Sequence, residues 1–303
     1  MKRLSLFLTT CLLAAMAFSQ EEIKLYPNGP AESNGLESQE KHRDKEFLMN
    51  ISEPRMQAFI APKDVANGAA VIICPGGGYV GVSYIKEGSE IARWFNERGI
   101  SAFVLFYRMP NGHPEIPLKD AQTAMDIIRN RAPEWNIDTK KIGIMGFSAG
   151  GHLASTVGTH FTDEKYRPAF MILGYPVVTM KDDGSHKGSR KALLGENPSE
   201  ELILRYSNEL HVTAQTPPTF IYHCSDDKTV PVANSENLIN AIKSFGTLAT
   251  LMVYDQGGHG FGMRKRDIEA DVWPFMLHEF LFEQGLAKEH PNSTIPQAVP
   301  KTK

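Results

Sequence analysis

The chain has 303 residues, of which 42% are hydrophobic and 22% charged, and its formal net charge at pH 7 is −3. A charge this small, without a large basic cluster, argues against a nucleic-acid or membrane-surface partner. Three cysteines are too few for a disulfide framework. We expect Cys74 and Cys224, each at the end of an apolar run, to be buried free thiols.

Residues 1–19 are typical of a secretory signal peptide. Two basic residues precede an apolar stretch that ends near Phe18, and small residues precede Gln20. The stretch is too short to span a bilayer comfortably. Cys11 offers the alternative of a lipid anchor, although the apolar stretch continues beyond it. The sequence therefore predicts a secreted or periplasmic protein.

Residues 20–54 are polar, and we expect them to form an N-terminal arm with little regular structure. Between this arm and a tail at 288–303, which we expect to be disordered, residues 55–287 alternate between apolar runs and segments of helical periodicity. Strands are expected at 55–60, 69–74, 100–107, 142–145, 169–173, 219–223 and 250–254, and helices at 88–98, 118–131, 151–160, 232–245 and 268–282.

This alternation predicts an α/β fold, in which a mostly parallel, doubly wound sheet carries helices on both faces. Residues 177–217 interrupt the rhythm with two short helical pieces. We expect an insertion over the strand ends there, either as a wall of a substrate pocket or as a plain surface excursion.

The segment Gly146-Phe147-Ser148-Ala149-Gly150 lies between a predicted strand and a predicted helix. A serine between two glycines at this spacing is typical of a nucleophile elbow. Glycine lacks the Cβ atom that would collide with the backbone in so tight a turn. Ser148 would then lie at the carboxyl edge of the sheet and at a helix N-terminus, where the helix dipole favours developing negative charge.

A serine hydroxyl is a weak nucleophile that needs a base within hydrogen-bond reach. His259, flanked by glycines just after the strand predicted at 250–254, is the candidate base. Asp226 and Asp227 follow the strand predicted at 219–223, and either could orient the histidine. The order Ser…Asp…His is that of α/β-hydrolases. We favour Asp227 because it precedes Val-Pro at the spacing usual in such hydrolases; Asp226 is the alternative, and the other carboxylate would shape the turn.

The tetrahedral intermediate of acyl transfer needs amide donors for its oxyanion. The glycines of Pro75-Gly76-Gly77-Gly78-Tyr79, which follow the strand predicted at 69–74, allow the backbone to approach a reacting carbonyl closely. We expect the donors to be the amides of Gly77 and Gly78, together with that of Ala149. The loop does not match the G-x-G-x-x-G pattern of dinucleotide sites.

Together these motifs resemble the α/β-hydrolase esterases related to acetyl xylan esterases and bacterial feruloyl/acetyl esterases, over about residues 55–283. The motifs are PGGGY (75–79), FYR (106–108), GFSAGGH (146–152), DDKTVP (226–231) and GGHGF (257–261). The resemblance implies an α/β-hydrolase fold with no metal and no organic cofactor. Many relatives have histidine where this chain has Pro75, which leaves the hydrogen bonding of the glycine loop open.

The resemblance also assigns roles by position. Ser148 would be the nucleophile, Asp227 the orienting acid and His259 the general base. Gly77, Gly78 and Ala149 would form the oxyanion hole.

Other residues beside these motifs have less specific interpretations. Tyr79 and Tyr107 lie near the glycine loop, where they would contact a sugar, wall the pocket or pack in the core. We expect Arg108 to pair with Asp120 or another carboxylate. His152, at the end of GFSAGGH, and His223, just before DDKTVP, are expected to be packed, hydrogen-bonded histidines.

The chemistry predicted is two-step acyl transfer by a serine esterase. The resemblance and the signal segment favour a secreted enzyme that removes small acyl groups, above all acetyl, from a carbohydrate such as xylan. A feruloyl or aryl esterase, a lipid esterase and a peptidase are alternatives on the same three residues. A catalytically silent hydrolase fold that binds carbohydrate is a third class. No oligomeric interface is evident from the sequence.

Overall fold

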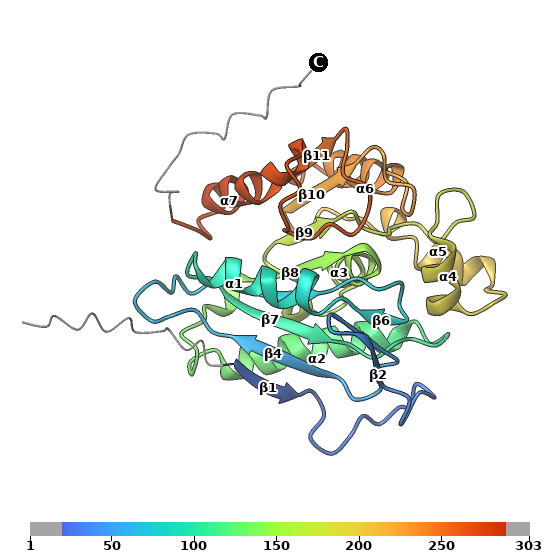
Figure 1. Cartoon of the computed structure of the whole chain (residues 1–303), viewed down its shortest axis with the longest axis horizontal. Helices are drawn as coiled ribbons and strands as arrows, with labels where there is room; N and C mark the ends of the chain where they lie inside the picture. Colours follow the sequence, from blue (N-terminus) through green and yellow to red (C-terminus); the bar gives the residue numbers. More distant parts are fainter. Residues whose placement is uncertain (1–19, 289–303) are drawn as a thin grey trace, which may run out of the picture.

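The centre of the computed structural model, which describes residues 20–288, is an eight-stranded sheet with helices on both faces (Figure 1). The predicted signal segment, Cys11 and residues 289–303 of the predicted tail lie outside the described residues. In spatial order the strands are β1 (Gln20–Lys24), β4 (Arg55–Phe59), β7 (Ser101–Phe106), β5 (Ala70–Cys74), β8 (Ile142–Phe147), β9 (Met171–Gly174), β10 (Thr219–Cys224) and β11 (Ala249–Tyr254).

Six neighbouring strands of this sheet, from β7 to β11, run parallel. Every residue of β5, β7, β8 and β10 is buried. Continuous apolar runs are what strands covered on both faces require, because helices shield each side from water. The predicted α/β architecture is confirmed.

Helices α1 and α7 lie in front of the sheet in Figure 1, and α2 and α3 lie behind it. Helix α6 packs on β10 and β11. Helix α7 begins later than predicted, because residues 269–272 form a separate 3-10 turn that ends against Trp273. The bounds are α1 (Glu90–Asn96), α2 (Glu115–Arg131), α3 (Ser148–Thr159), α6 (Ala233–Ser244) and α7 (Trp273–Glu283).

The N-terminal arm has more structure than predicted. Strand β1 pairs antiparallel with β4 and extends the main sheet. Strands β2 (Lys41–Asp44) and β3 (Phe47–Met49) form a hairpin, and β3 also pairs with β6 (Gly81–Val82) beyond the glycine loop. The prediction of little regular structure is wrong, because these strands are short and depend on pairing with distant residues, and β1 and β2 are also mainly polar. All four residues of β2 are exposed, so no apolar alternation marks it.

The interval 177–217 does carry the two short predicted helices, α4 (Lys187–Leu194) and α5 (Glu200–Arg205). In Figure 1 they lie beyond the arrowheads of the parallel strands, and therefore at the carboxyl edge of the sheet. Parallel strands bring their carboxyl ends to one edge, which is where ligand sites of α/β folds form. The insertion thus stands at the edge where Ser148 is placed.

A buried ion pair joins the end of β7 to helix α2, as predicted for Arg108 and Asp120. The guanidinium Nη2 lies 2.6 Å and Nε 3.0–3.1 Å from the Asp120 carboxylate, which also accepts the Arg108 backbone N–H at 2.8 Å. The Tyr26 hydroxyl donates to the same carboxylate at 3.1 Å. Removing one partner would leave a buried charge unpaired. Through the Tyr26 hydroxyl, the N-terminal arm is fastened to this pair.

The two described cysteines, Cys74 and Cys224, are free and buried, as predicted. Among residues 20–288, no helix is both long and apolar enough to cross a membrane.

Candidate active site

Ser148 lies at the turn between β8 and α3, and its backbone has φ +51°. Few non-glycine residues adopt this left-handed conformation, and strain of this kind gathers at functional sites. The turn is tight because the chain passes against its neighbours. A Cβ on Gly150 would overlap the carbonyl oxygen of Cys74, and one on Gly146 would overlap the carbonyl oxygen of Gly150. Both glycines of the predicted elbow are therefore sterically required.

Three side chains from different strand ends meet at this turn. The Oγ of Ser148 lies 2.8 Å from Nε2 of His259, and Nδ1 of His259 lies 2.6 Å from Oδ2 of Asp227. A carboxylate can only accept, so the imidazole donates through Nδ1 and its Nε2 is left to accept the serine proton. This is the arrangement of nucleophile, base and acid that acyl transfer requires.

Asp227 is buried, and every group that it contacts donates a hydrogen bond. Its Oδ1 accepts the N–H groups of Thr229 and Val230 at 2.8 and 2.9 Å, and its Oδ2 lies 3.2 Å from Nε2 of His223. Burial by itself would raise the pKa of Asp227, but the hydrogen bonds from His223, His259 and the Val230 amide outweigh it and hold the pKa well below its usual value. The carboxylate facing His259 is thus ionised.

The other carboxylate of the pair, Asp226, bonds to the backbone of the loop that carries the imidazole. Its Oδ1 accepts the backbone N–H of Gly258 at 2.7 Å and so ties the loop that carries His259 to the end of β10. The structure thus brings Asp227, and not Asp226, to His259.

His223 has a larger part in the site than predicted. Both groups near its Nε2, the Asp227 carboxylate and the Val230 carbonyl at 3.0 Å, can only accept, so Nε2 carries a proton. Its Nδ1 lies 2.7 Å from the hydroxyl of Ser235. A packed histidine was predicted, but its contact with Asp227 was not. The one signal in the sequence is its position four residues before the acid.

The glycine loop after β5 lies beside the elbow. Gly77 and Gly78 have φ +152° and +65°, which glycine adopts at little cost. The Gly76 N–H donates to Glu87, whereas among the described residues no acceptor takes the N–H of Gly77 or Gly78. The Ala149 N–H is in the first turn of α3, where no helical acceptor exists. The three predicted oxyanion donors are therefore unoccupied beside Ser148.

Glu87, in the π-helical turn η1 (Ile85–Ser89), is a site residue that the sequence analysis missed. Its buried carboxylate accepts the Gly76 N–H at 2.9 Å and the Tyr175 hydroxyl at 2.7 Å. The same hydroxyl accepts the Gly262 N–H at 3.0 Å, and the Tyr175 ring stands edge-on to His259 with centroids 4.9 Å apart. One carboxylate thus links the glycine loop to the histidine loop. No local sequence pattern marks it.

The suggestion that Tyr79 or Tyr107 contacts a sugar is wrong for their side chains, because both are buried. The Tyr107 hydroxyl donates to the Pro75 carbonyl at 2.8 Å, and the Tyr79 hydroxyl lies 2.8 Å from Nδ1 of His152. Both phenols thus form hydrogen bonds within the core, and that of Tyr107 holds Pro75 at the start of the glycine loop. His152 is the packed histidine that was predicted: its Nε2 lies 2.8 Å from the Tyr206 carbonyl.

The insertion contributes His186 to the site. Its Nδ1 accepts the backbone N–H of Ser189 at 3.3 Å and caps helix α4. Its Cε1 lies 3.9 Å from the position a Cβ on Gly78 would take. Burial lowers the pKa of His186, and the neighbouring His259 acts in the same direction. Because Nδ1 accepts, the neutral ring carries its proton on Nε2, which leaves a donor beside the glycine loop.

Within residues 20–288, no group of three or more His, Cys, Asp or Glu side chains is arranged to hold a metal ion.

Comparison with known proteins shows which family the chain belongs to. Residues 56–242 match the family described as BD-FAE, which is more than half of the chain. The chain belongs to the BD-FAE family. The α/β-hydrolase resemblance predicted from the motifs is thereby confirmed.

Two relatives of this BD-FAE protein bear names that refer to xylan. An acetylxylan esterase of Xylanibacter ruminicola is 39% identical over 72% of this chain and 46% of its own length. Endo-1,4-beta-xylanase B of Butyrivibrio fibrisolvens is 37% identical over 68% of this chain and 34% of its own length. The chain thus spans less than half the length of either relative.

A solved structure covers most of this chain. The acetyl ester-xyloside bifunctional hydrolase from Caldicellulosiruptor lactoaceticus is 36% identical with a TM-score of 0.76, over 88% of this chain and 97% of its own. The carboxylesterase Cest-2923 of Lactobacillus plantarum, 24% identical with a TM-score of 0.68 over 83% of this chain and 98% of its own, shares the fold.

The buried His152 predicts a pH dependence of stability. Burial lowers its pKa from 6.5 to about 4. Between these two pH values the unfolded chain binds a proton on this histidine that the folded chain excludes. The contribution of the neutral His152 to stability is therefore lost as pH falls from 6.5 towards 4. We expect this effect to lower the free energy of unfolding by about 2 kcal/mol between pH 7 and pH 5.

Urea unfolding at both pH values, for the wild type and for His152→Gln, measures this contribution. The variant should be less stable at pH 7 but should change less between the two pH values. Equal changes in the two proteins would show that another group carries the proton.

Proposed function

We propose that this protein is a serine-dependent carboxylic ester hydrolase that removes acetyl groups from a carbohydrate polymer such as xylan. The observation that carries the proposal is the continuous chain from Ser148 Oγ through His259 to Asp227, at 2.8 and 2.6 Å, beside free backbone amides. Nucleophile, base, acid and oxyanion donors are the complete set of groups needed for acyl transfer.

In the first half-reaction, Nε2 of His259 takes the proton of the Ser148 hydroxyl as Oγ attacks the ester carbonyl carbon. The negative charge on the carbonyl oxygen is stabilised by the N–H groups of Gly77, Gly78 and Ala149. His259 then passes the proton to the leaving alkoxide oxygen, the C–O bond breaks, and an acyl-serine and a free alcohol result. Asp227 stays ionised and stabilises the imidazolium.

In the second half-reaction, a water molecule takes the place of the alcohol. His259 removes one of its protons as the water oxygen attacks the acyl carbon, and the same amides hold the oxyanion. Collapse of the intermediate returns the proton to Oγ of Ser148 and releases the carboxylic acid. Two easier steps replace one difficult hydrolysis.

Two observations support an acetylated carbohydrate as the substrate. The relatives include an acetylxylan esterase, and the structural neighbour is an acetyl ester-xyloside hydrolase. In addition, His186 offers an N–H donor beside the glycine loop, where it can bind a hydroxyl of the alcohol half of a sugar ester. The signal segment predicted at residues 1–19 is consistent with action outside the cell on a polymer.

Substrate profiling tests the proposal. Wild type and Ser148→Ala should be assayed on 4-nitrophenyl acetate, 4-nitrophenyl butyrate, methyl ferulate and acetylated xylan, with acetate release measured for the polymer. We expect hydrolysis of the acetyl esters, including the polymer, and loss of nearly all activity in the variant. Faster hydrolysis of methyl ferulate than of the acetyl esters would indicate that the protein is a feruloyl esterase. Failure to react with a fluorophosphonate would indicate a silent hydrolase fold.

The two neighbouring carboxylates give a matched pair of variants. Asp227→Asn removes the charge that fixes the His259 tautomer, and we expect kcat on 4-nitrophenyl acetate to fall by roughly three to four orders of magnitude. Asp226→Asn keeps an oxygen that can accept the Gly258 N–H, so its kcat should stay within a few-fold of wild type. Comparable losses in the two variants would contradict the assignment of Asp227.

Glu87 should act through the glycine loop. Both of its partners, the Gly76 N–H and the Tyr175 hydroxyl, are donors. Glutamine offers only one acceptor and sets an NH2 group against the other donor. We expect Glu87→Gln to lower kcat on 4-nitrophenyl acetate by roughly tenfold to a hundredfold, with little change in KM, because oxyanion stabilisation acts on the transition state.

The control is Glu90→Gln, one turn further along and paired at the surface with Arg264. It should leave kcat unchanged. A Glu87→Gln variant with wild-type kcat would show that the link between the loops is dispensable for catalysis.

A further inference from the structure

A cavity of about 390 Å³ lies at the opposite edge of the sheet from Ser148. Thr139 and Lys140 on its wall lie just before β8 begins, and Ala169 lies two residues before β9, whereas Ser148 follows the carboxyl end of β8. The six residues of β8 separate the two edges by roughly 20 Å. The volume lies at the lower end of the range of about 300–1,000 Å³ found for small-molecule sites.

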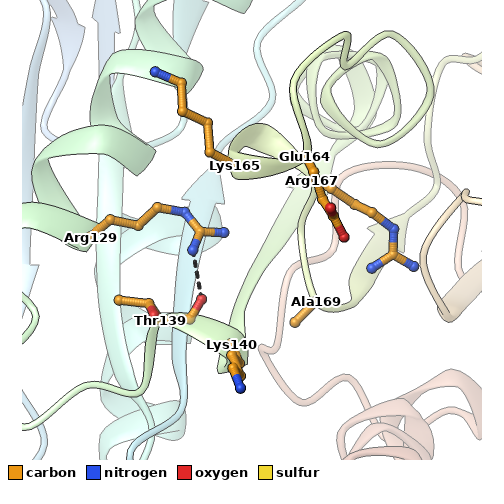
Figure 2. A pocket seen from close by; sticks show the side chains of 7 residues that line it. All are labelled: Arg129, Thr139, Lys140, Glu164, Lys165, Arg167 and Ala169. Carbon is orange, nitrogen blue, oxygen red and sulfur yellow. Dashed lines mark hydrogen bonds between the residues drawn. The ribbon is translucent and has the colours of Figure 1, made fainter.

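The wall of this cavity is strongly basic. Figure 2 shows Arg129 on one side, Arg167 and Glu164 on the other, and Lys140 between them. A fourth cation, Lys165, is engaged elsewhere, since its Nζ lies 3.5 Å from Asp126. Among the described residues, no carboxylate lies within 4.0 Å of the charged nitrogens of Arg129, Lys140 or Arg167, so the three cations share the wall with Glu164 without forming an ion pair.

The two arginines are held in place by backbone carbonyls. Nη1 of Arg129 donates to the Thr139 carbonyl at 2.8 Å, and Nε of Arg167 donates to the Gln215 carbonyl at 2.6 Å. Nε of Arg129 is buried and has no hydrogen-bond partner in the described chain. Burial lowers the pKa of Arg129, because desolvation outweighs the more distant charge of Asp126. A bound anion would offset this cost.

The donor set indicates what kind of anion fits. Planar guanidinium groups match a carboxylate, which they bind through paired hydrogen bonds. Glu164 would repel a simple inorganic anion, but its carboxylate can accept from hydroxyl groups, as can Oγ1 of Thr139. A sugar acid carries both kinds of group: a carboxylate for the arginines and hydroxyls for Glu164 and Thr139.

We propose that this cavity binds a uronate, a sugar unit bearing a carboxylate, and is a second carbohydrate contact of the protein. Its use in catalysis rests on the proposed function: a polymer with acidic side groups, held at the amino edge of the sheet, would meet Ser148 at a raised effective concentration. The cavity contains no residue of the ester-cleaving site.

Calorimetric titration of the full chain with D-glucuronate, D-glucose and sodium sulfate, at equal ionic strength, tests the site. We expect saturable binding of glucuronate, none of glucose and weaker binding of sulfate. Arg129→Gln and Lys140→Gln should each weaken glucuronate binding, the arginine variant by roughly tenfold or more. The Lys140 variant serves as the readout should the arginine variant fail to fold.

The matched control is Arg131→Gln, on the same helix but paired at the surface with Glu21 and Glu134. It should leave glucuronate affinity unchanged. The proposal is overturned if sulfate binds as tightly as glucuronate, if the control loses as much affinity as Arg129→Gln, or if wild type does not bind glucuronate.

Kinetics separate this proposal from the proposed function. In Arg129→Gln, KM should rise several-fold on an acetylated polymer that carries uronate groups, while kcat on 4-nitrophenyl acetate stays unchanged. Glucuronate binding without any polymer deacetylation would support the uronate site and contradict the proposed polysaccharide esterase activity. Polymer deacetylation without glucuronate binding would support the esterase activity and contradict the uronate site.

Discussion

The close approach of two backbone turns is the constraint on which the candidate site depends. Strands β5 and β8 are parallel neighbours, so the turns at their carboxyl ends must lie side by side. They fit only because Gly76 and Gly150 have no side chains. A Cβ on Gly76 would lie 2.7 Å from the Phe147 carbonyl oxygen, and one on Gly150 would overlap the Cys74 carbonyl oxygen. This contact sets the free amides of the glycine loop beside Ser148.

Two buried carboxylates then hold the turns in register, each by accepting from donors only. Asp227 holds His259, and Glu87 holds the Gly76 amide and the Tyr175 hydroxyl. An isolated buried charge is costly, but one that is fully hydrogen-bonded keeps its neighbours in a single geometry. Tyr175 stands at the junction, since its ring contacts His259 while its hydroxyl joins Glu87 to Gly262. The glycine loop and His259 are therefore positioned together.

What was predictable from the sequence follows from this architecture. Continuous apolar runs such as Ala70–Cys74 and the glycine spacing around Ser148 are local patterns, because buried parallel strands and tight turns limit residue type at each position. Glu87 and the pairing of β1 are not local. A polar residue in a helical turn carries no sign that it faces a distant amide, and a short polar strand is defined by its partner. Tyr79 was ambiguous for the same reason, since burial decides between packing and contact with a sugar.

A purely structural role does not account for the hydrogen bonds of Arg129 on the cavity wall. Arg129 is in the last turn of α2, where a cation interacts favourably with the helix dipole. That interaction would aim the guanidinium at the terminal carbonyls of α2. Its hydrogen bond goes instead to the carbonyl of Thr139, in the 3-10 turn η2 (Thr139–Lys141), and Nε is left buried without a partner in the described chain. Lys140 and Arg167 lie outside α2, so its dipole does not explain their position, yet they line the same cavity. Cations from three separate segments on the wall of one cavity cost stability through mutual repulsion, and an anionic ligand is the group that would offset that cost.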